Sequence, residues 1–229
     1  MNRKIRKALL TVVLLIAIGF CGVYLSHDSL SNWLVTRQKI TISRSKIAKT
    51  KRQADNEANY NFKAVKPLSL TQLSKLSLKK GNLPIVGKIV IPNVKMNLPI
   101  SRGVESRNLA FSAGTLKATE KMGEANYALA GHHMANNDHI LFGPLVRTSV
   151  GEKVYVSDMT DVYIYQIWLR KYISANQLAV LNNQKGQNLL TLVTCDDTGT
   201  GRLLVQGKLV QKVRLSKLDK ALRSQINQN

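Results

Sequence analysis

Residues 9–25 form an apolar stretch that contains no charged residue, and residues 1–8 before it contain four basic residues. As a helix this stretch would span roughly 26 Å, near the lower limit for crossing a bilayer. The apolar region of a cleavable signal peptide is usually shorter and ends at a small-residue cleavage site, which residues 22–26 match poorly. The pattern therefore favours an uncleaved transmembrane signal anchor over residues 9–25 rather than a cleaved signal.

Basic residues are distributed unevenly around this stretch, since the next ones after it are Arg37 and Lys39. The positive-inside rule then predicts a cytoplasmic tail over residues 1–8 and an extracellular location for the bulk of the chain. Residues 26–66 are polar and basic, which predicts a partly helical stalk or linker close to the membrane. Such a charge run is usually a solvated face, and contact with anionic lipid or wall polymer is the alternative.

The pattern changes near Val65, where apolar residues begin to recur at regular spacings. Leucines at helical spacing predict a short helix over residues 69–78 with Ser69 near its N-cap. A polar helix or a frayed tail is expected over residues 216–226. Between them, seven or more short strands separated by turn signals predict a mainly β domain, either a closed barrel or a sandwich. The strand-like runs are residues 87–91, 94–100, 127–131, 153–156, 162–171, 189–194 and 203–210.

The composition narrows the classes of partner. The chain has 229 residues, 44% of them hydrophobic, which is enough for one domain with extensions. Its 34 Lys and Arg against 13 Asp and Glu give a formal net charge of +21. This excess suits nucleic acid, an anionic membrane or an anionic cell wall. Because only 6% of the residues are aromatic and no RNA-binding or zinc-finger signature is present, we expect no nucleic-acid partner.

The two cysteines differ in their surroundings. Cys21 lies in the apolar stretch, so Cys195 is alone in the polar part of the chain, which excludes a disulfide scaffold and a four-cysteine zinc site. Cys195 follows the strand-like run 189–194 and precedes a polar, glycine-containing loop. This position suits contact with a substrate, although a lone cysteine is more commonly buried and inert.

Two other reactive side chains also lie at the ends of strand-like runs. His132 follows residues 126–131, and Arg202 opens the run 203–210. An imidazole with a pKa of about 6.5 can exchange protons with a thiol whose ordinary pKa is about 8.5. A guanidinium can donate to an oxyanion or hold a substrate backbone. Cys195, His132 and Arg202 therefore form a candidate catalytic set.

Two other readings of these residues are less favourable. A metal site could combine His132, His133, Asp138 and His139, but adjacent strand residues point to opposite faces and cannot easily bind one ion. A papain-like protease places its cysteine before its histidine in the sequence, and this chain has the reverse order.

The residues around the candidate catalytic set resemble the sortase family, and in particular its class A. Residues 191–195 read TLVTC, which matches the TLxTC signature of the family. Residues 126–133 are similar to the strand that supplies the sortase histidine, and Arg202 sits where the family has its catalytic arginine. The resemblance covers roughly residues 65–213 together with the N-terminal anchor. The opening of the class A domain is matched by residues 82–92, 113–115 and 122–123.

The resemblance implies a closed eight-stranded sortase β-barrel with short helices over residues 67–213, followed by a polar C-terminal tail over residues 214–229. It also implies a transpeptidase that recognises LPXTG-type sorting signals of secreted proteins. The thiolate attacks the carbonyl of the Thr–Gly bond, and an amine of the peptidoglycan precursor lipid II resolves the thioacyl-enzyme. No cofactor is needed, and the catalytic domain faces the outside of a Gram-positive cell.

Site roles follow from the resemblance residue by residue. Cys195 would be the nucleophile, His132 the acid and base, and Arg202 the residue that orients the substrate and stabilises the oxyanion. The Leu-Pro part of the sorting signal would lie in a groove, and the candidates for contact with the substrate are Ala130, Thr191, Val193, Thr194 and His133.

One departure from the family concerns calcium. Some class A sortases bind Ca²⁺, and Glu120 and Glu124 match two of the ligand positions. Lys117 and Asn183 stand where further carboxylates would fall. Because Ca²⁺ requires several oxygen ligands and a lysine opposes it, we expect activity without calcium.

Two alternatives to a wall-anchoring sortase remain. A pilin-polymerising sortase often has a second membrane span at its C-terminus, and residues 211–229 contain no apolar run. A non-enzymatic wall-binding module would use the basic stalk for binding and would carry Cys195 as an inert thiol.

Overall fold

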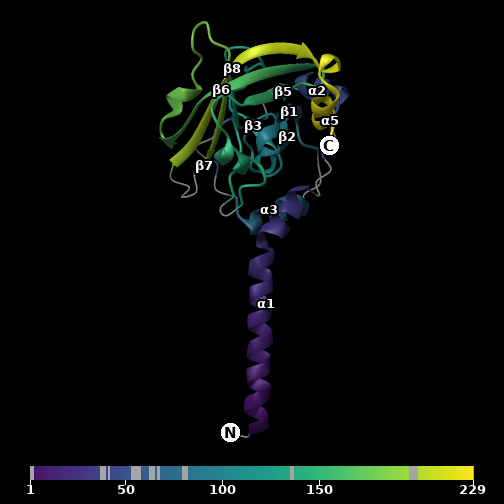
Figure 1. The fold of residues 1–229 in the computed structure, drawn as a ribbon, viewed down its shortest axis with the longest axis vertical. Coiled ribbons are helices and arrows are strands. Elements are labelled where there is room, and N and C mark those ends of the chain that lie inside the picture. The colour runs from purple at the N-terminus through teal and green to yellow at the C-terminus, as the bar shows by residue number, and fades with distance from the viewer. Residues whose placement is uncertain are drawn as a thin grey trace.

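Eight β-strands form the body of the described structure, a computed structural model (Figure 1). The structure describes residues 3–36, 40, 42–52, 58–61, 65, 68–78, 82–134, 137–195 and 201–228. The strands are β1 (Ile85–Ile91), β2 (Met96–Ser101), β3 (Ala113–Thr115), β4 (Asn126–Ala130), β5 (Lys153–Ser157), β6 (Asp161–Ser174), β7 (Leu189–Cys195) and β8 (Gly201–Arg214). They close into a barrel in the order β1-β2-β3-β4-β7-β8-β6-β5.

Closure of the sheet decides between the two architectures that the strand pattern allowed. The pairs β2–β3 and β4–β7 run parallel, and the remaining neighbours run antiparallel. A closed, mainly β barrel of eight strands is therefore confirmed. The seven strand-like runs are all strands, with ends shifted by up to a few residues. Strand β3 was not predicted, because three residues are too few to show the period-2 alternation of a strand.

Alternation along the strands separates an inner face from an outer face. Leu190 and Leu192 of β7 belong to the main hydrophobic core together with Leu129 of β4. Ala128 and Ala130 of β4 belong to a separate, smaller apolar cluster. Since successive side chains of a strand point to opposite faces, the outer surface of β4 and β7 carries its own packing layer.

Short helices lie outside the barrel (Figure 1). The predicted helix over residues 69–78 is confirmed as α3. Its N-cap is reciprocal: the Gln72 amide N–H donates to Ser69 Oγ (3.2 Å), and the Ser69 amide N–H donates to Gln72 Oε1 (3.1 Å). Within the described residues, the helices are α1 (Arg3–Thr36), α2 (Arg44–Arg52), α3 (Leu70–Leu78), η3 (Pro92–Val94), α4 (Ser106–Leu109), η4 (Gly143–Arg147), η5 (Leu178–Leu181), η6 (Leu215–Lys217) and α5 (Lys220–Asn227).

Helix α1 projects away from the barrel and contains the predicted anchor, residues 9–25 (Figure 1). Across the part of the chain that the structure describes, no helix meets the length and apolarity needed to span a membrane. The transmembrane anchor and its orientation stay predictions.

The segments before and after the barrel both pack against it. In the predicted stalk, α2 buries Ile47, which packs with Ile42 and with Ile85 of β1. At the C-terminal end, α5 begins at Asp219, whose carboxylate accepts a hydrogen bond from the Leu222 amide (2.9 Å). Leu222 and Ile226 of α5 are buried against the barrel. Burial of each such side chain contributes about 1.5–3 kcal/mol, so this helix is docked rather than frayed.

Candidate active site

Strands β4 and β7 bring Cys195 and His132 to the same end of the barrel. The two strands are parallel, with Ala128 opposite Thr191 and Ala130 opposite Val193. The Gly131 amide donates to the Val193 carbonyl (3.2 Å), so the pairing continues past the end of β4. If the same register is continued by one more step of two residues, we expect His132 to lie beside Cys195.

Arg202 lies beside Cys195 on the other neighbouring strand. Strand β8 runs antiparallel to β7, and Arg202 is the pairing partner of Cys195. Its Nη1 donates to the Gly201 carbonyl (2.8 Å). Leu203 and Val205 of β8 belong to the inner core, so alternation puts Arg202 on the outer face. In the barrel order β4-β7-β8, the strand that ends at Cys195 thus lies between the strand that leads into His132 and the strand that carries Arg202.

Burial sets the protonation state of the histidine. His132 is 3% exposed, and this burial lowers the pKa of its imidazole from 6.5 to about 4. The ring is therefore neutral at neutral pH and can accept a proton. Cys195 is only partly buried, which leaves the thiol within reach of a substrate.

Packing behind His132 fixes the end of β4. The Phe142 amide donates to the His132 carbonyl (3.0 Å), and Phe142 is fully buried. A Cβ at Gly131 would lie 2.4 Å from the Phe142 ring. A side chain at Gly131 would therefore force the Phe142 ring or the end of β4 to shift.

The predicted groove residues separate into two groups. Ala130 and Val193 lie on the outer face, and Val193 lines a small pocket together with Arg202 and with Val180 and Leu181 from η5. Thr191 lies on the same face. It is fully buried, and its hydroxyl donates to Asn126 Oδ1 (2.6 Å).

Thr194 and His133 are placed differently. Thr194 alternates with Val193 and Cys195, so its side chain points into the barrel, and it is fully buried. His133 Nε2 lies 2.8 Å from Asp138 Oδ1 in the loop that follows β4. The structure does not bring Thr194 to the outer face, so its role in substrate contact stays a prediction with no geometric support.

Lys117 occupies the region where the calcium candidates lie. Its ammonium donates to the carbonyl of Asn126, to the carbonyl of Leu181 (3.2 Å) and to Asn183 Oδ1 (3.1 Å). It also lies 3.9 Å from Glu120 Oε2. The lysine thus places a positive charge among the oxygen atoms that a cation would otherwise use.

Glu120 is built into the end of the β3–β4 pairing rather than exposed to solvent. Its carboxylate accepts hydrogen bonds from the Ala128 amide (2.9 Å) and the Leu116 amide (3.2 Å). Burial raises the pKa of Glu120 from 4.5 to about 8, against the opposing effect of these hydrogen bonds and of Lys117. Glu124 is largely exposed and pairs with Lys121 (3.7 Å). Within the described residues, no three His, Cys, Asp or Glu side chains cluster as metal ligands.

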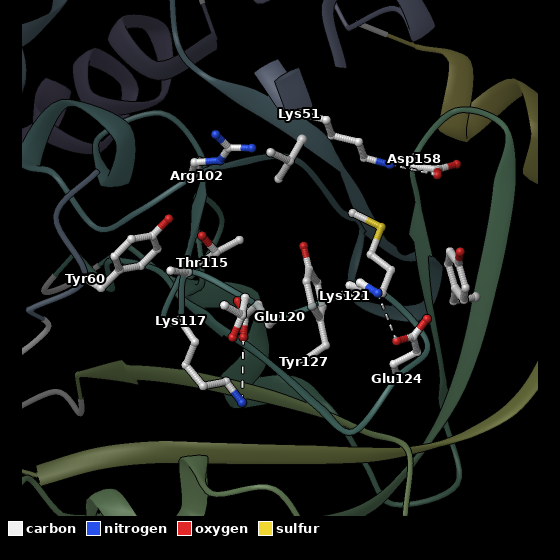
Figure 2. A pocket seen from close by; sticks show the side chains of 15 residues that line it. Lys51, Tyr60, Arg102, Thr115, Lys117, Glu120, Lys121, Glu124, Tyr127 and Asp158 are labelled. Carbon is white, nitrogen blue, oxygen red and sulfur yellow. Dashed lines mark hydrogen bonds and ion pairs between the residues drawn. The ribbon is translucent and has the colours of Figure 1, made fainter. Parts of the chain in front are cut away.

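A larger cavity of about 580 Å³ lies toward the end of the barrel at which β4 begins, away from Cys195. Figure 2 shows Lys117 beside Glu120 and Lys121 beside Glu124 along its wall. Lys51, a third lysine of the lining, pairs with Asp158 (3.2 Å). The three lysines of the lining therefore each lie near an acidic side chain of the chain itself, and Arg102 is a fourth basic residue of the lining.

Comparisons with known proteins agree with this geometry. The family model described as "Sortase domain" matches residues 89–210. The chain is 34% identical over 227 residues to Sortase A of Streptococcus agalactiae, covering 93% of this chain and 88% of that protein. It is 32% identical over 179 residues to Sortase A of Listeria monocytogenes, covering 77% of this chain and 80% of that protein.

The solved structure of Listeria monocytogenes sortase A aligns with a TM-score of 0.57 at 34% identity, over 62% of this chain and 97% of that chain. Sortase C-3 from Streptococcus pneumoniae aligns with a TM-score of 0.59 at 19% identity, over 87% of this chain and 98% of that chain, which shows the shared fold alone. The chain belongs to the sortase family of cysteine transpeptidases, and the resemblance to its class A is confirmed.

Sequence reasoning missed a set of buried polar residues beneath η5. Asn126, Thr191 and Gln206 come from β4, β7 and β8 and are joined by hydrogen bonds. The only signal in the sequence was Gln206 itself, a polar residue in the apolar run 203–207. Their partners in η5 could not be found from local patterns.

Proposed function

We propose that this protein is a membrane-anchored transpeptidase that cleaves LPXTG-type sorting signals between Thr and Gly and transfers the protein to an amine of a peptidoglycan precursor. The observation that supports the proposal is the order β4-β7-β8, in which the strand that ends at Cys195 lies between the strand leading into His132 and the strand carrying Arg202. Membership of the sortase family supports the reaction class, and the TLVTC residues support the assignment of the nucleophile.

The proposed first half-reaction begins with a neutral imidazole. Cys195 Sγ attacks the carbonyl carbon of the threonine, and its proton passes to His132. Arg202 donates hydrogen bonds to the oxyanion that forms. The tetrahedral intermediate then breaks its C–N bond, and the departing glycine nitrogen takes the proton from His132. A thioester between Cys195 and the threonine remains.

The second half-reaction reverses these roles. The incoming amine attacks the thioester carbon while His132 accepts its proton. The C–S bond breaks, and the proton returns to the Cys195 sulfur, which regenerates the enzyme. One peptide bond is broken and one is formed, so no oxidant, nucleotide or other co-reactant is needed.

The location of the protein is part of the same proposal. Residues 9–25 supply an uncharged stretch, and the side chains described there are exposed along α1, among them Leu9, Leu14 and Ile18 at 59–60%. We infer that this segment anchors the chain and that the catalytic domain lies on the extracellular face, with the basic residues 1–8 in the cytoplasm.

We further propose that the activity does not depend on calcium. The support is Lys117, whose ammonium already donates to oxygen atoms of Asn126, Leu181 and Asn183. The expected result is equal turnover in EGTA and in added calcium. A severalfold rise in turnover on calcium addition would contradict the proposal.

The decisive test of the function is peptide cleavage by the full chain in detergent. The wild type is mixed with a fluorogenic LPXTG peptide, with and without hydroxylamine as a generic amine acceptor. We expect cleavage, a peptide hydroxamate as product, and loss of both in Cys195→Ala. Cys21→Ala is the matched control and should keep both. Absence of wild-type cleavage, or cleavage that survives Cys195→Ala, refutes the proposal.

A further inference from the structure

One turn of helix, η5, is held by side chains that come from three different places in the barrel. The Val180 carbonyl accepts hydrogen bonds from Asn126 Nδ2 (3.0 Å) and Gln206 Nε2 (3.4 Å). Asn126 Nδ2 also donates to the Asn182 carbonyl (3.1 Å). Lys117 Nζ donates to the Leu181 carbonyl (3.2 Å). Three successive backbone carbonyls of the β6–β7 connection are therefore bound by side chains rather than by a strand.

These donors form one connected network on the outer face of the sheet. Gln206 Nε2 donates to Thr191 Oγ1 (3.0 Å), and Thr191 Oγ1 donates to Asn126 Oδ1 (2.6 Å). Asn126, Thr191 and Gln206 are at most 3% exposed. A buried polar group without a partner costs about 1–3 kcal/mol, so the turn and the network stabilise each other.

The network reaches the surface at Asn183. The Asn183 side chain accepts from Lys117 Nζ (3.1 Å) and from the Asn126 amide (3.4 Å). Asn183 is exposed, and so is its neighbour Asn182, whose contact to the network is made by the backbone carbonyl. The Asn183 side chain can therefore be replaced without creating a cavity among the buried residues of the network.

The network holds one wall of a small pocket of about 10 Å³, which Arg202 also lines. The side chains of Val180 and Leu181 line that pocket together with Val193 and Arg202. Leu181 also packs against the apolar cluster that includes Ala128 and Ala130 of β4. The positions of the Val180, Leu181 and Asn182 carbonyls therefore set how far the side chains of η5 lie from the strands beneath them.

We propose that Gln206 and Asn126 are positioning residues that pre-form the wall of the sorting-signal groove by holding the carbonyls of residues 180–182. The inference rests on the proposed function, which supplies the substrate. The part of the substrate concerned is the Leu-Pro segment that precedes the scissile threonine. A wall held in place before binding lowers the ordering cost of binding. The residues act on substrate binding through Val180 and Leu181 and do not touch the reacting atoms.

The first test replaces the internal donor. Gln206→Met keeps the length of the side chain and removes its N–H groups. We expect KM for the LPXTG peptide to rise about threefold to tenfold, the equivalent of one net hydrogen bond, with kcat nearly unchanged. The alkylation rate of Cys195 by iodoacetamide should stay at the wild-type value. Gln211→Met, the same change at an exposed position of β8, is the control and should leave KM unchanged.

The second test covers the case in which Gln206→Met does not fold. Asn183→Ala removes the side-chain oxygen that accepts hydrogen bonds from Lys117 and from the Asn126 backbone amide. Asn182→Ala removes a neighbouring exposed side chain and leaves the hydrogen bond to the Asn182 carbonyl in place. We expect the first change, and not the second, to raise KM. An unchanged or lower KM in Asn183→Ala and Gln206→Met would overturn the inference, because the wall would then not need to be held before the peptide binds.

A third measurement separates this inference from the proposed function. Amide hydrogen exchange of residues 178–183 should be faster in Asn183→Ala than in the wild type, whether or not the peptide is cleaved. If the wild type cleaves no LPXTG peptide but exchange in the variant accelerates, the proposed function fails and the positioning network stands. If exchange is unchanged, the network does not hold the turn and the inference is wrong.

Discussion

Burial of His132 makes the stability of the protein depend on pH in a defined direction. The pKa of the imidazole is about 4 in the folded chain and 6.5 in its ordinary state. As pH falls below 6.5, the unfolded chain binds a proton that the folded chain does not bind. Folding stability is therefore lost as pH falls from 6.5 toward 4 and is fully present above that range.

The size of this effect follows from the shift. One unit of pKa corresponds to about 1.4 kcal/mol, and integration between about pH 7 and pH 5 gives a loss of about 2 kcal/mol from this one group. Such a loss is a large fraction of the stability of a typical domain, about 5–15 kcal/mol. Glu120 acts in the opposite sense over part of the range because burial raises its pKa. The contribution of His132 must therefore be isolated by comparison with a variant.

The assay is urea unfolding of the wild type and of His132→Gln at the two pH values, followed by circular dichroism. His132→Gln cannot titrate, so its free energy of unfolding should fall by about 2 kcal/mol less than that of the wild type between the two pH values. His139→Gln, at an exposed histidine, is the matched control and should behave as the wild type. Equal losses in the wild type and His132→Gln would refute the reasoning that burial keeps the imidazole neutral.

Two further predictions concern residues that position the site. Gly131→Ala should lower the free energy of unfolding by about 1–3 kcal/mol and reduce kcat/KM, because the added Cβ would meet the buried Phe142 ring and displace the end of β4. Thermal unfolding and peptide cleavage measure the two effects. Wild-type values for both would contradict the prediction, because they would show that the ring moves aside at no cost. The wild type should lose stability as pH rises from 4.5 to about 8, because Glu120 keeps a proton in the folded chain that the unfolded chain releases. Glu120→Gln cannot titrate and should not show this loss. Parallel pH profiles of the free energy of unfolding for the two proteins would contradict the prediction.

Local sequence patterns predicted the parts of the site one at a time. The alternation of residues 189–194 placed Cys195 at the end of a strand, and the run 126–131 did the same for His132. The N-cap of α3 near Ser69 followed from leucines at helical spacing over residues 69–78. These features depend on neighbours within a few positions, which is why the sequence by itself determined them. The TLVTC residues added the family, which the comparisons confirm.

Only the tertiary structure decided which of these parts meet. The parallel pairing of β4 with β7 joins residues about sixty positions apart, and no local pattern specifies that register. The same pairing brings Thr191 into a buried network with Asn126 and Gln206, which no local pattern indicated. Each of these polar side chains is stable in the interior only because its partners come from other strands and from η5. Such a network forms only when the barrel closes. Local sequence patterns do not predict it, because its members lie far apart along the chain.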